Sequence, residues 1–275
     1  MKIAYLGYDI LCECLFALEK AGCEIMEIFT CPTDNVFEFN HRICEYSHRR
    51  GIPCTVDPIS LADLLRLSNA GCQAVFCAGY FYKIPVTGSP LPMVNVHPAL
   101  LPEGRGAWPM PVQILRQMRQ GGVTLHKVAE QWDAGDILLQ KAFPIAPTDD
   151  LELVTQKVNR VAVELCTYMA LHFEEVWMQA TPQGAGSYWP CPQKEDYTIT
   201  PETSPEKIDR ILRAFYGFDC YLNDGSKEQQ IVRGRFFPQC NRMPFGLAFP
   251  LENGGTGYWV QGGRIETPPT CAEVL

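Results

Sequence analysis

The sequence lacks the features of secreted and membrane proteins. Its first residues lead, after a short apolar run, into Tyr8 and Asp9, which is not the pattern of a signal peptide. No stretch reaches the roughly 18 consecutive apolar residues that a membrane-spanning helix needs. We therefore expect a cytoplasmic protein without a membrane partner.

Motifs for metal and dinucleotide binding are also missing. The thirteen cysteines are scattered and form no Cys-x-x-Cys pair, which favours free, buried thiols over disulfides or a zinc site. The Gly-x-Gly-x-x-Gly fingerprint does not follow the first predicted strand. We therefore expect no metal, and a nicotinamide-dependent dehydrogenase is disfavoured.

Basic runs are absent as well. The chain has a formal net charge of −8 and a pI of about 5.2. Residues 191–275 contain nine Lys and Arg against eleven Asp and Glu, a net charge of −2. Because proteins neutralise the phosphates of nucleic acids with clustered Lys and Arg, this balance argues against a nucleic-acid partner.

The first two thirds of the chain alternate between strand and helix patterns. Apolar runs predict strands at residues 3–7, 24–30, 54–56, 74–78, 93–97, 123–128 and 137–143. Helical patterns fall at residues 10–21, 41–50, 60–68, 108–120 and 151–178. This order predicts an α/β fold with a Rossmann-like, mostly parallel sheet and helices on both faces.

The last third has a different composition. Residues 181–193 are rich in Pro and Gly and carry no charge, which is typical of a linker. Beyond them, a short helix at residues 204–215 precedes apolar runs at 217–222, 230–237 and 258–261. We therefore divide the chain into a domain of residues 1–182, a linker of 183–195 and a small β-rich domain of 196–275.

A candidate catalytic stretch lies at the end of the fifth predicted strand. Residues 93–97 alternate between apolar and polar, and Pro98, which cannot donate to a ladder, should end the strand. Asn95 and His97 are two residues apart, so their side chains leave the same face. An amide donor and an imidazole facing one pocket suit a reaction that builds negative charge on a carbonyl oxygen. Asp133 would orient and charge the imidazole if its loop folds back against the strand.

Four ordered motifs resemble those of formyltransferases that use 10-formyltetrahydrofolate. They read Asn95 to Pro102, Arg105-Gly106, Gly122 to His126 and Asp133 to Asp136. The resemblance implies that Asn95, His97 and Asp133 are catalytic, with 10-formyltetrahydrofolate as the formyl donor. Ala99 departs from the family's usual Ser, which puts one hydrogen bond of the loop in doubt.

The resemblance also implies roles for neighbouring residues. In the family, the backbone of the segment after the fourth strand binds the pterin ring, which falls here on Tyr82, Lys83 and Ile84. Asp136 is assigned to the same site, with a structural role in its loop as the alternative, and His126 is expected to be structural. Residues Tyr8, Asp9 and Arg105 are candidates for the acceptor side, where a solvated role for Arg105 is equally compatible with the sequence.

The acceptor amine is left open among three readings. A nucleotide-linked amino sugar is favoured by the acidic charge and by the resemblance of residues 29–35 to sugar-nucleotide formyltransferases. The alternatives are a methionyl-tRNA formyltransferase and the formylation of a carrier-bound or free amino acid. As partners we expect a small-molecule amine and a second copy of the chain in a homodimer.

Overall fold

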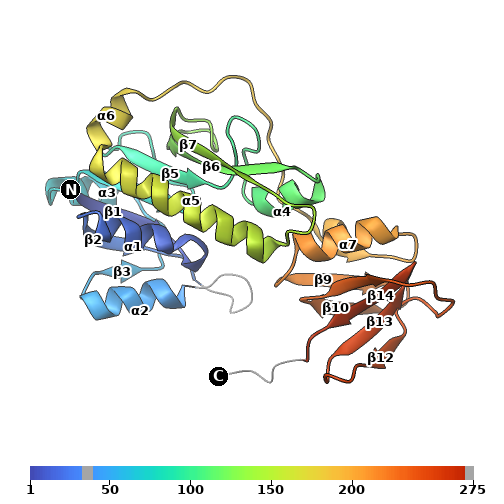
Figure 1. The fold of residues 1–275 in the computed structure, drawn as a ribbon. Helices are drawn as coiled ribbons and strands as arrows, with labels where there is room; N and C mark the ends of the chain where they lie inside the picture. The colour runs from blue at the N-terminus through green and yellow to red at the C-terminus, as the bar shows by residue number, and fades with distance from the viewer. Residues whose placement is uncertain (33–39, 270–275) are drawn as a thin grey trace. The chain divides into compact units, whose positions relative to one another are not determined.

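The structure is a computed structural model in which residues 1–32 and 40–269 are described (Figure 1). It divides into two compact units. The sheet unit comprises Met1–Ala107, Gln120–Pro144 and Thr155–Trp189. The β-rich unit comprises Trp108–Arg119, Ile145–Val154 and the residues from Pro190 onward. Two short internal segments therefore belong with the C-terminal residues, whereas the sequence predicted one boundary, at the linker of residues 183–195.

The sheet unit is built on a seven-stranded sheet in the order β3-β2-β1-β4-β5-β6-β7. The strands are β1 (Lys2–Gly7), β2 (Glu24–Phe29), β3 (Cys54–Thr55), β4 (Ala74–Ala78), β5 (Met93–His97), β6 (Gln120–Lys127) and β7 (Ile137–Pro144). The pairs from β3 to β5 are parallel, and β5-β6 and β6-β7 are antiparallel. The predicted mostly parallel sheet is confirmed.

Helices cover both faces of this sheet, as predicted. The helices are α1 (Glu13–Lys20), α2 (His41–Arg50), α3 (Leu61–Asn69), α5 (Leu151–Leu171) and α6 (Phe173–Met178), with a short 3-10 turn at Asp9–Leu11. On one face, Leu64 and Leu67 of α3 share a buried cluster with Ala4 and Leu6 of β1. Since Tyr5 alternates with Ala4 and Leu6, it points to the opposite face.

The opposite face is covered by α1 and α5. The Tyr5 hydroxyl donates to the carbonyl of Leu11 at 3.2 Å, just before α1. Burial raises the pKa of Tyr5, and the neighbouring thiols of Cys14 in α1 and Cys166 in α5 add to that rise. The thiols of Cys14 and Cys166 are therefore core groups of this face, and Cys72 and Cys77 lie in the cluster on the other face, whereas Cys191 and Cys240 are exposed.

Two helices differ from the prediction. The helix expected at 108–120 is α4 (Pro109–Leu115), because Gln117 turns left-handed with φ 53° and ends it. Gly122 then lies inside β6, where a Cβ would come within 2.2 Å of the Leu100 side chain. Glycine at this position permits close packing of Leu100 against the strand. The long helix expected at 151–178 is interrupted at His172, between α5 and α6.

The described part of the β-rich unit holds two small sheets, helices α4 and α7, and the first residues of α5. One sheet has the order β10-β9-β8 and the other β11-β14-β13-β12. Helix α7 (Pro205–Ala214) begins as expected, with the Ser204 hydroxyl accepting from the Lys207 amide at 3.3 Å. The strands are β8 (Thr198–Ile199), β9 (Asp219–Asn223), β10 (Glu228–Val232), β11 (Arg235–Pro238), β12 (Ala248–Pro250), β13 (Thr256–Val260) and β14 (Gly263–Thr267), and a 3-10 turn spans Lys194–Tyr197.

The segment expected to be a linker is paired with the sheet unit over its first half. Arg105 donates its amide to the carbonyl of Ser187 at 3.0 Å and accepts from the amide of Trp189 at 2.7 Å. Thr181 exchanges two backbone hydrogen bonds with Ile137, each 2.8 Å long. Pro and Gly in this stretch therefore shape an ordered strap of residues 181–189. Within the described ranges, no helix combines the length and apolarity needed to cross a membrane.

Candidate active site

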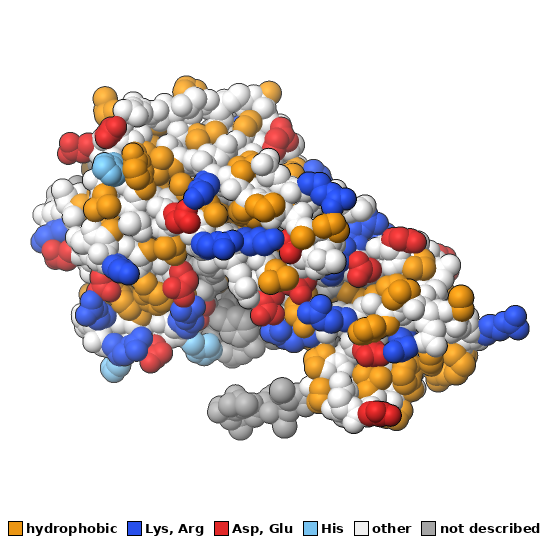
Figure 2. All heavy atoms as spheres, in the orientation of Figure 1, with side chains coloured by type: hydrophobic (Ala, Val, Ile, Leu, Met, Phe, Trp, Pro, Cys, Tyr) orange, Lys and Arg blue, Asp and Glu red, His pale blue; other side chains and the backbone are white. Residues whose placement is uncertain are grey.

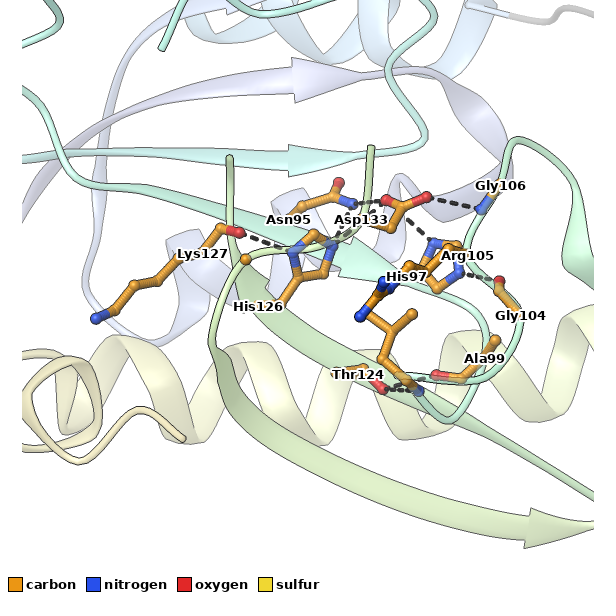
Figure 3. Close-up of polar contacts among 12 residues, drawn as sticks. Asn95, His97, Ala99, Gly104, Arg105, Gly106, Thr124, His126, Lys127 and Asp133 are labelled. Carbon is orange, nitrogen blue, oxygen red and sulfur yellow. Dashed lines mark hydrogen bonds and ion pairs between the residues drawn. The ribbon is translucent and has the colours of Figure 1, made fainter. Parts of the chain in front are cut away.

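Strand β5 presents Asn95 and His97 on one face, as the alternation predicted (Figure 3). The strand is flanked by β4 and β6. His97 is 4% exposed, whereas Asn95 is half-buried. The imidazole Nε2 lies 2.8 Å from the carbonyl oxygen of Gly104, so this nitrogen carries a proton and donates it.

Asp133 is the centre of the polar cluster. Its Oδ1 accepts from the Asn95 amide nitrogen at 3.3 Å and lies 3.5 Å from His97 Nδ1. The same oxygen lies 3.5 Å from His126 Nε2, and Oδ2 accepts from the Gly106 amide at 2.9 Å. The loop after β6 thus folds back against β5, and the three residues expected to be catalytic are brought together.

Two glycines allow this loop arrangement. A Cβ on Gly135 would stand 1.8 Å from the carbonyl oxygen of Lys127, so the Asp-Ala-Gly-Asp turn can lie against β6 only without a side chain there. Gly106 has φ 128°, and a Cβ there would be 2.2 Å from the Trp189 carbonyl oxygen. Glycine at position 106 therefore lets the backbone reach both Asp133 and the strap.

Burial controls the charge of His97. It lowers the pKa of the imidazole below its usual 6.5, and the nearby Asp133 carboxylate offsets this only in part. We expected Asp133 to keep the imidazole charged in the resting protein. Burial opposes that charge, because the carboxylate at 3.5 Å offsets only part of the cost of removing an imidazolium from water.

Asp133 itself stays ionised. Burial alone raises the pKa of this carboxyl group, but the contacts with His126 and His97 and the Gly106 amide bring it below 3.8. The side chain is only 10% exposed. The site therefore holds a carboxylate that is largely shielded from water and ready to accept a proton.

His126 contributes more to the site than the sequence suggested. Its Nδ1 donates to the Lys127 carbonyl at 2.8 Å, which leaves Nε2 to accept from the Asn95 amide nitrogen at 3.0 Å. Both amide hydrogens of Asn95 are thereby directed to His126 and Asp133. The signal for this role was present, since His126 closes the third motif.

The loop after His97 is held by Thr124 of β6. Its hydroxyl donates to the carbonyl of Ala99 at 2.6 Å and accepts from the amide of Leu101 at 3.1 Å. Gln140 adds donors to Thr124 and to the Leu101 carbonyl, at 2.8 and 2.7 Å. A buried threonine thus fixes the loop even though residue 99 is Ala.

Gln183 is a residue of the site that no sequence motif indicated. Its Nε2 donates to the carbonyls of Asp133 and Gly135, at 2.9 and 2.5 Å. Its Oε1 accepts from Arg105 Nε and Nη2 at 3.1 and 2.9 Å. Gln183 lies in the segment predicted as a linker, so only the folded chain brings it to the catalytic loop.

The remaining predicted site residues lie outside the trio. Arg105 is engaged by Gln183, and its Nη2 also donates to the Gly184 carbonyl at 3.1 Å. Asp136 pairs with the Lys127 ammonium at 3.3 Å. Asp9 accepts from the amides of Arg42 and Ile43 at 2.9 and 3.1 Å, which caps the start of α2. Tyr8 precedes Asp9 and is half-buried.

The segment expected to bind folate borders a cleft of about 480 Å³ in the sheet unit. The cleft is lined by Ile59, Ser60, Leu61, Lys83, Ile84, Pro85, Val86, Thr87 and Glu130. Lys83 is exposed, while the Ile84 side chain is part of the core below. Tyr82 packs edge-on against Tyr80, with ring centroids 5.6 Å apart, and does not line the cleft. Residues 33–35, the end of the stretch 29–35 compared with sugar-nucleotide enzymes, lie outside the described residues.

Known proteins share parts of this sequence. Residues 64–168 match the family model described as formyl transferase. A methionyl-tRNA formyltransferase from Coprothermobacter proteolyticus is 34% identical over 155 residues, which are 56% of this chain and 51% of that protein. The chain spans about half the length of such curated relatives.

Solved structures share the fold over nearly the whole chain. HypX from Aquifex aeolicus, in complex with tetrahydrofolic acid, has a TM-score of 0.71 at 19% identity and covers 97% of this chain and 43% of HypX. An N-formyltransferase from Helicobacter canadensis, in complex with folinic acid and dTDP-3-aminofucose, has a TM-score of 0.63 at 16% identity. That match covers 97% of this chain and 98% of the other.

The family match covers β4 to β7, the strands that carry or flank all four motifs. The resemblance seen in the sequence is therefore confirmed. Over residues 64–168 the chain is similar to the formyl transferase family, and its sequence relatives bear the name methionyl-tRNA formyltransferase.

Proposed function

We propose that this protein transfers a formyl group from 10-formyltetrahydrofolate to a primary amine. The observation that carries the proposal is the convergence of Asn95, His97 and Asp133 within 3.5 Å contacts inside the matched family region. A shielded carboxylate, an imidazole and an amide donor are the groups that acyl transfer to an amine requires.

The amine attacks the formyl carbon, and a tetrahedral intermediate with an oxyanion forms. Collapse breaks the bond to the folate nitrogen, so the amine loses one proton and the leaving nitrogen gains one. Asp133 accepts the proton of the amine, directly or through water, and passes it to Nδ1 of the neutral His97, which lies 3.5 Å away. The imidazolium that results delivers a proton to the leaving nitrogen and returns to the neutral form. Asn95 stabilises the oxyanion by exchanging one of its hydrogen bonds, to His126 or Asp133, for one to the substrate.

The donor would be held near the cleft at residues 83–87. Ile84 and Pro85 supply apolar surface there, and the ammonium of Lys83 stands at the rim, 3.9 Å from the Glu130 carboxylate. A ring system with hydrogen-bonding edges fits such a site better than a dinucleotide, because a glycine-rich phosphate loop is missing. The folate ligands of the two structural relatives support the same choice.

For the acceptor we propose an amino sugar on a nucleotide diphosphate. Gripping tRNA requires several phosphates to be neutralised, and residues 191–275 carry a net charge of −2. On the face shown in Figure 2, acidic and basic side chains are interspersed. A diphosphate group can be bound by only one or two cationic side chains and some backbone amides.

A methionyl-tRNA acceptor is the second candidate, because the relatives that match in sequence bear that name. One assay distinguishes the two candidate acceptors. Initial rates are measured with 10-formyltetrahydrofolate and either methionyl-tRNA or a panel of nucleotide amino sugars, at low and physiological salt. Asn95→Ala serves as the inactive control.

We expect turnover with a sugar nucleotide and a shallow dependence on salt. Efficient formylation of the RNA that weakens steeply as salt rises would reject the sugar proposal and establish the second candidate. Absence of turnover with either acceptor, together with no binding of 5-formyltetrahydrofolate by calorimetry, would reject formyl transfer itself.

A further inference from the structure

The strap of residues 181–189 contacts both groups that flank His97. On one side of the imidazole stands the carboxylate of Asp133, and on the other the carbonyl of Gly104. Gln183 bonds the loop of Asp133, and the Ser187 hydroxyl accepts from the Gly104 amide at 3.3 Å. A segment that follows the catalytic motifs by about 50 residues therefore reaches both sides of their histidine.

Gln183 makes the larger contribution. Its side-chain amide bonds two carbonyls of the Asp133 turn and the guanidinium of Arg105, which precedes the Gly106 amide that binds Asp133 Oδ2. One side chain thus connects the two loops that hold the carboxylate. Asp133 has φ 51°, a left-handed conformation that is uncommon without glycine, so its turn depends on such support.

We propose that Gln183 is a positioning residue that locks the Asp133 turn to the Arg105-Gly106 loop and so sets the distance between Asp133 and His97. It touches no reacting atom in this role and acts through Asp133. The effect on turnover rests on the proposed formyl transfer, whereas the effect on the His97 environment does not.

The test is a titration of the five histidines by imidazole ¹H–¹⁵N correlation spectra of the ligand-free protein. His97 is assigned by the signal that disappears in His97→Gln. The titratable groups facing His97 are Asp133 and His126. Because the Asp133 charge raises the pKa of His97, a displaced carboxylate should lower that pKa further.

Gln183→Leu removes all four hydrogen bonds at nearly constant volume. We expect the pKa of His97 to fall, while Gln179→Leu, which removes a glutamine on the exposed surface, leaves it unchanged. Gln183→Met, a second neutral substitution of similar size, also removes these hydrogen bonds and should lower the same pKa without adding a charge. An unchanged or raised pKa of His97 in a folded Gln183 variant would overturn the proposal.

Two further readings complete the test. In turnover assays, Gln183→Leu should lower kcat by about 100-fold, the cost of a displacement near 1 Å at a reacting group, with little change in KM for the donor. If both Gln183 variants lose the dispersed spectrum of a folded protein, Gln183 is needed for folding and not for positioning, and the proposal is wrong. The pKa of His97 can be measured even if the protein has no formyl transfer activity. The positioning role of Gln183 and the proposed formyl transfer can therefore be rejected independently.

Discussion

A single oxygen, Asp133 Oδ1, lies 3.3 to 3.5 Å from nitrogens of Asn95, His97 and His126. The Asn95 amide nitrogen also contacts His126 Nε2. The second nitrogen of each imidazole, Nε2 of His97 and Nδ1 of His126, bonds a backbone carbonyl. The polar groups of the resting site therefore satisfy one another. These bonds keep the site ordered before substrate binds, and substrate must replace some of them.

The lowered pKa of His97 predicts a pH-dependent stability. The unfolded chain takes up a proton near pH 6.5, whereas the folded chain does so only at a lower pH, so acid favours unfolding. The stability of the wild type relative to His97→Gln should be greatest above pH 7 and should shrink as pH falls through 6.5. Urea unfolding of both proteins at several pH values between 5 and 8 measures it. A relative stability that grows toward acid would show that His97 is held as the cation.

The two aspartates of the Asp-Ala-Gly-Asp loop should differ in kinetics. Asp133→Asn removes the buried proton acceptor and should lower kcat by about 100-fold or more. Asp136→Asn breaks only the ion pair with Lys127, and the Asp136 side chain is 42% exposed. We therefore expect kcat to change by less than about fivefold. Steady-state rates of both variants decide the assignment, and the reverse order would mean that Asp136 is the catalytic carboxylate.

At the scale of elements, the site depends on two loops meeting at the end of one strand. Strand β5 fixes Asn95 and His97 through its pairing with β4 and β6. The loops are set by close backbone approach, at Gly135 against Lys127 and at Gly106 against Trp189. Regular secondary structure thus places two of the three residues proposed to be catalytic, and tight turns place the third.

Gly135→Ala tests this dependence. The new Cβ would meet the Lys127 carbonyl oxygen at 1.8 Å, so the turn must shift. We expect a loss of about 1 to 3 kcal/mol in the free energy of unfolding, together with a fall in kcat. Gly184→Ala is the matched control, because nothing lies within 4 Å of its Cβ position, and it should cost no more than about 0.5 kcal/mol. Equal effects of the two variants would contradict the role of close approach.

At the scale of the whole molecule, the chain crosses between its two units several times. Within the β-rich unit, Trp108 packs edge-on against Phe215 and Phe218, with ring centroids 5.8 and 5.0 Å apart. In the same unit, Arg213 donates to the Asp149 carbonyl at 3.0 Å. Internal segments from the first two thirds of the chain therefore need the C-terminal residues to cover their apolar side chains.

This interleaving predicts that the sequence-based domain of residues 1–182 does not fold independently. A chain truncated after Trp189 keeps the strap but loses α7 and Phe215, which follows it, and this leaves Trp108 exposed. We expect it to lose the cooperative thermal transition of the full chain, as measured by circular dichroism. An unchanged midpoint of unfolding would instead support a single boundary between residues 182 and 196.

Local pattern determined much of this protein. Alternating and helical periodicities predicted the order of strands and helices in the sheet unit, because each element buries one face against its neighbours. The same alternation put Asn95 and His97 on one face, which depends only on the geometry of a strand. The resemblance of four short motifs then supplied Asp133 as their partner.

Tertiary structure decided what depends on contacts between distant residues. Gln183 reaches Asp133 across 50 positions of the chain, and no local pattern marks such a contact. Asp9, expected on the acceptor side, caps α2 through Arg42 and Ile43 because two loops meet there. The charge of His97 likewise depends on burial, which a residue's neighbours in sequence do not set. Composition marked residues 181–189 as a linker, but their backbone groups found partners on the Arg105 loop and on β7, and these hydrogen bonds made them part of the site.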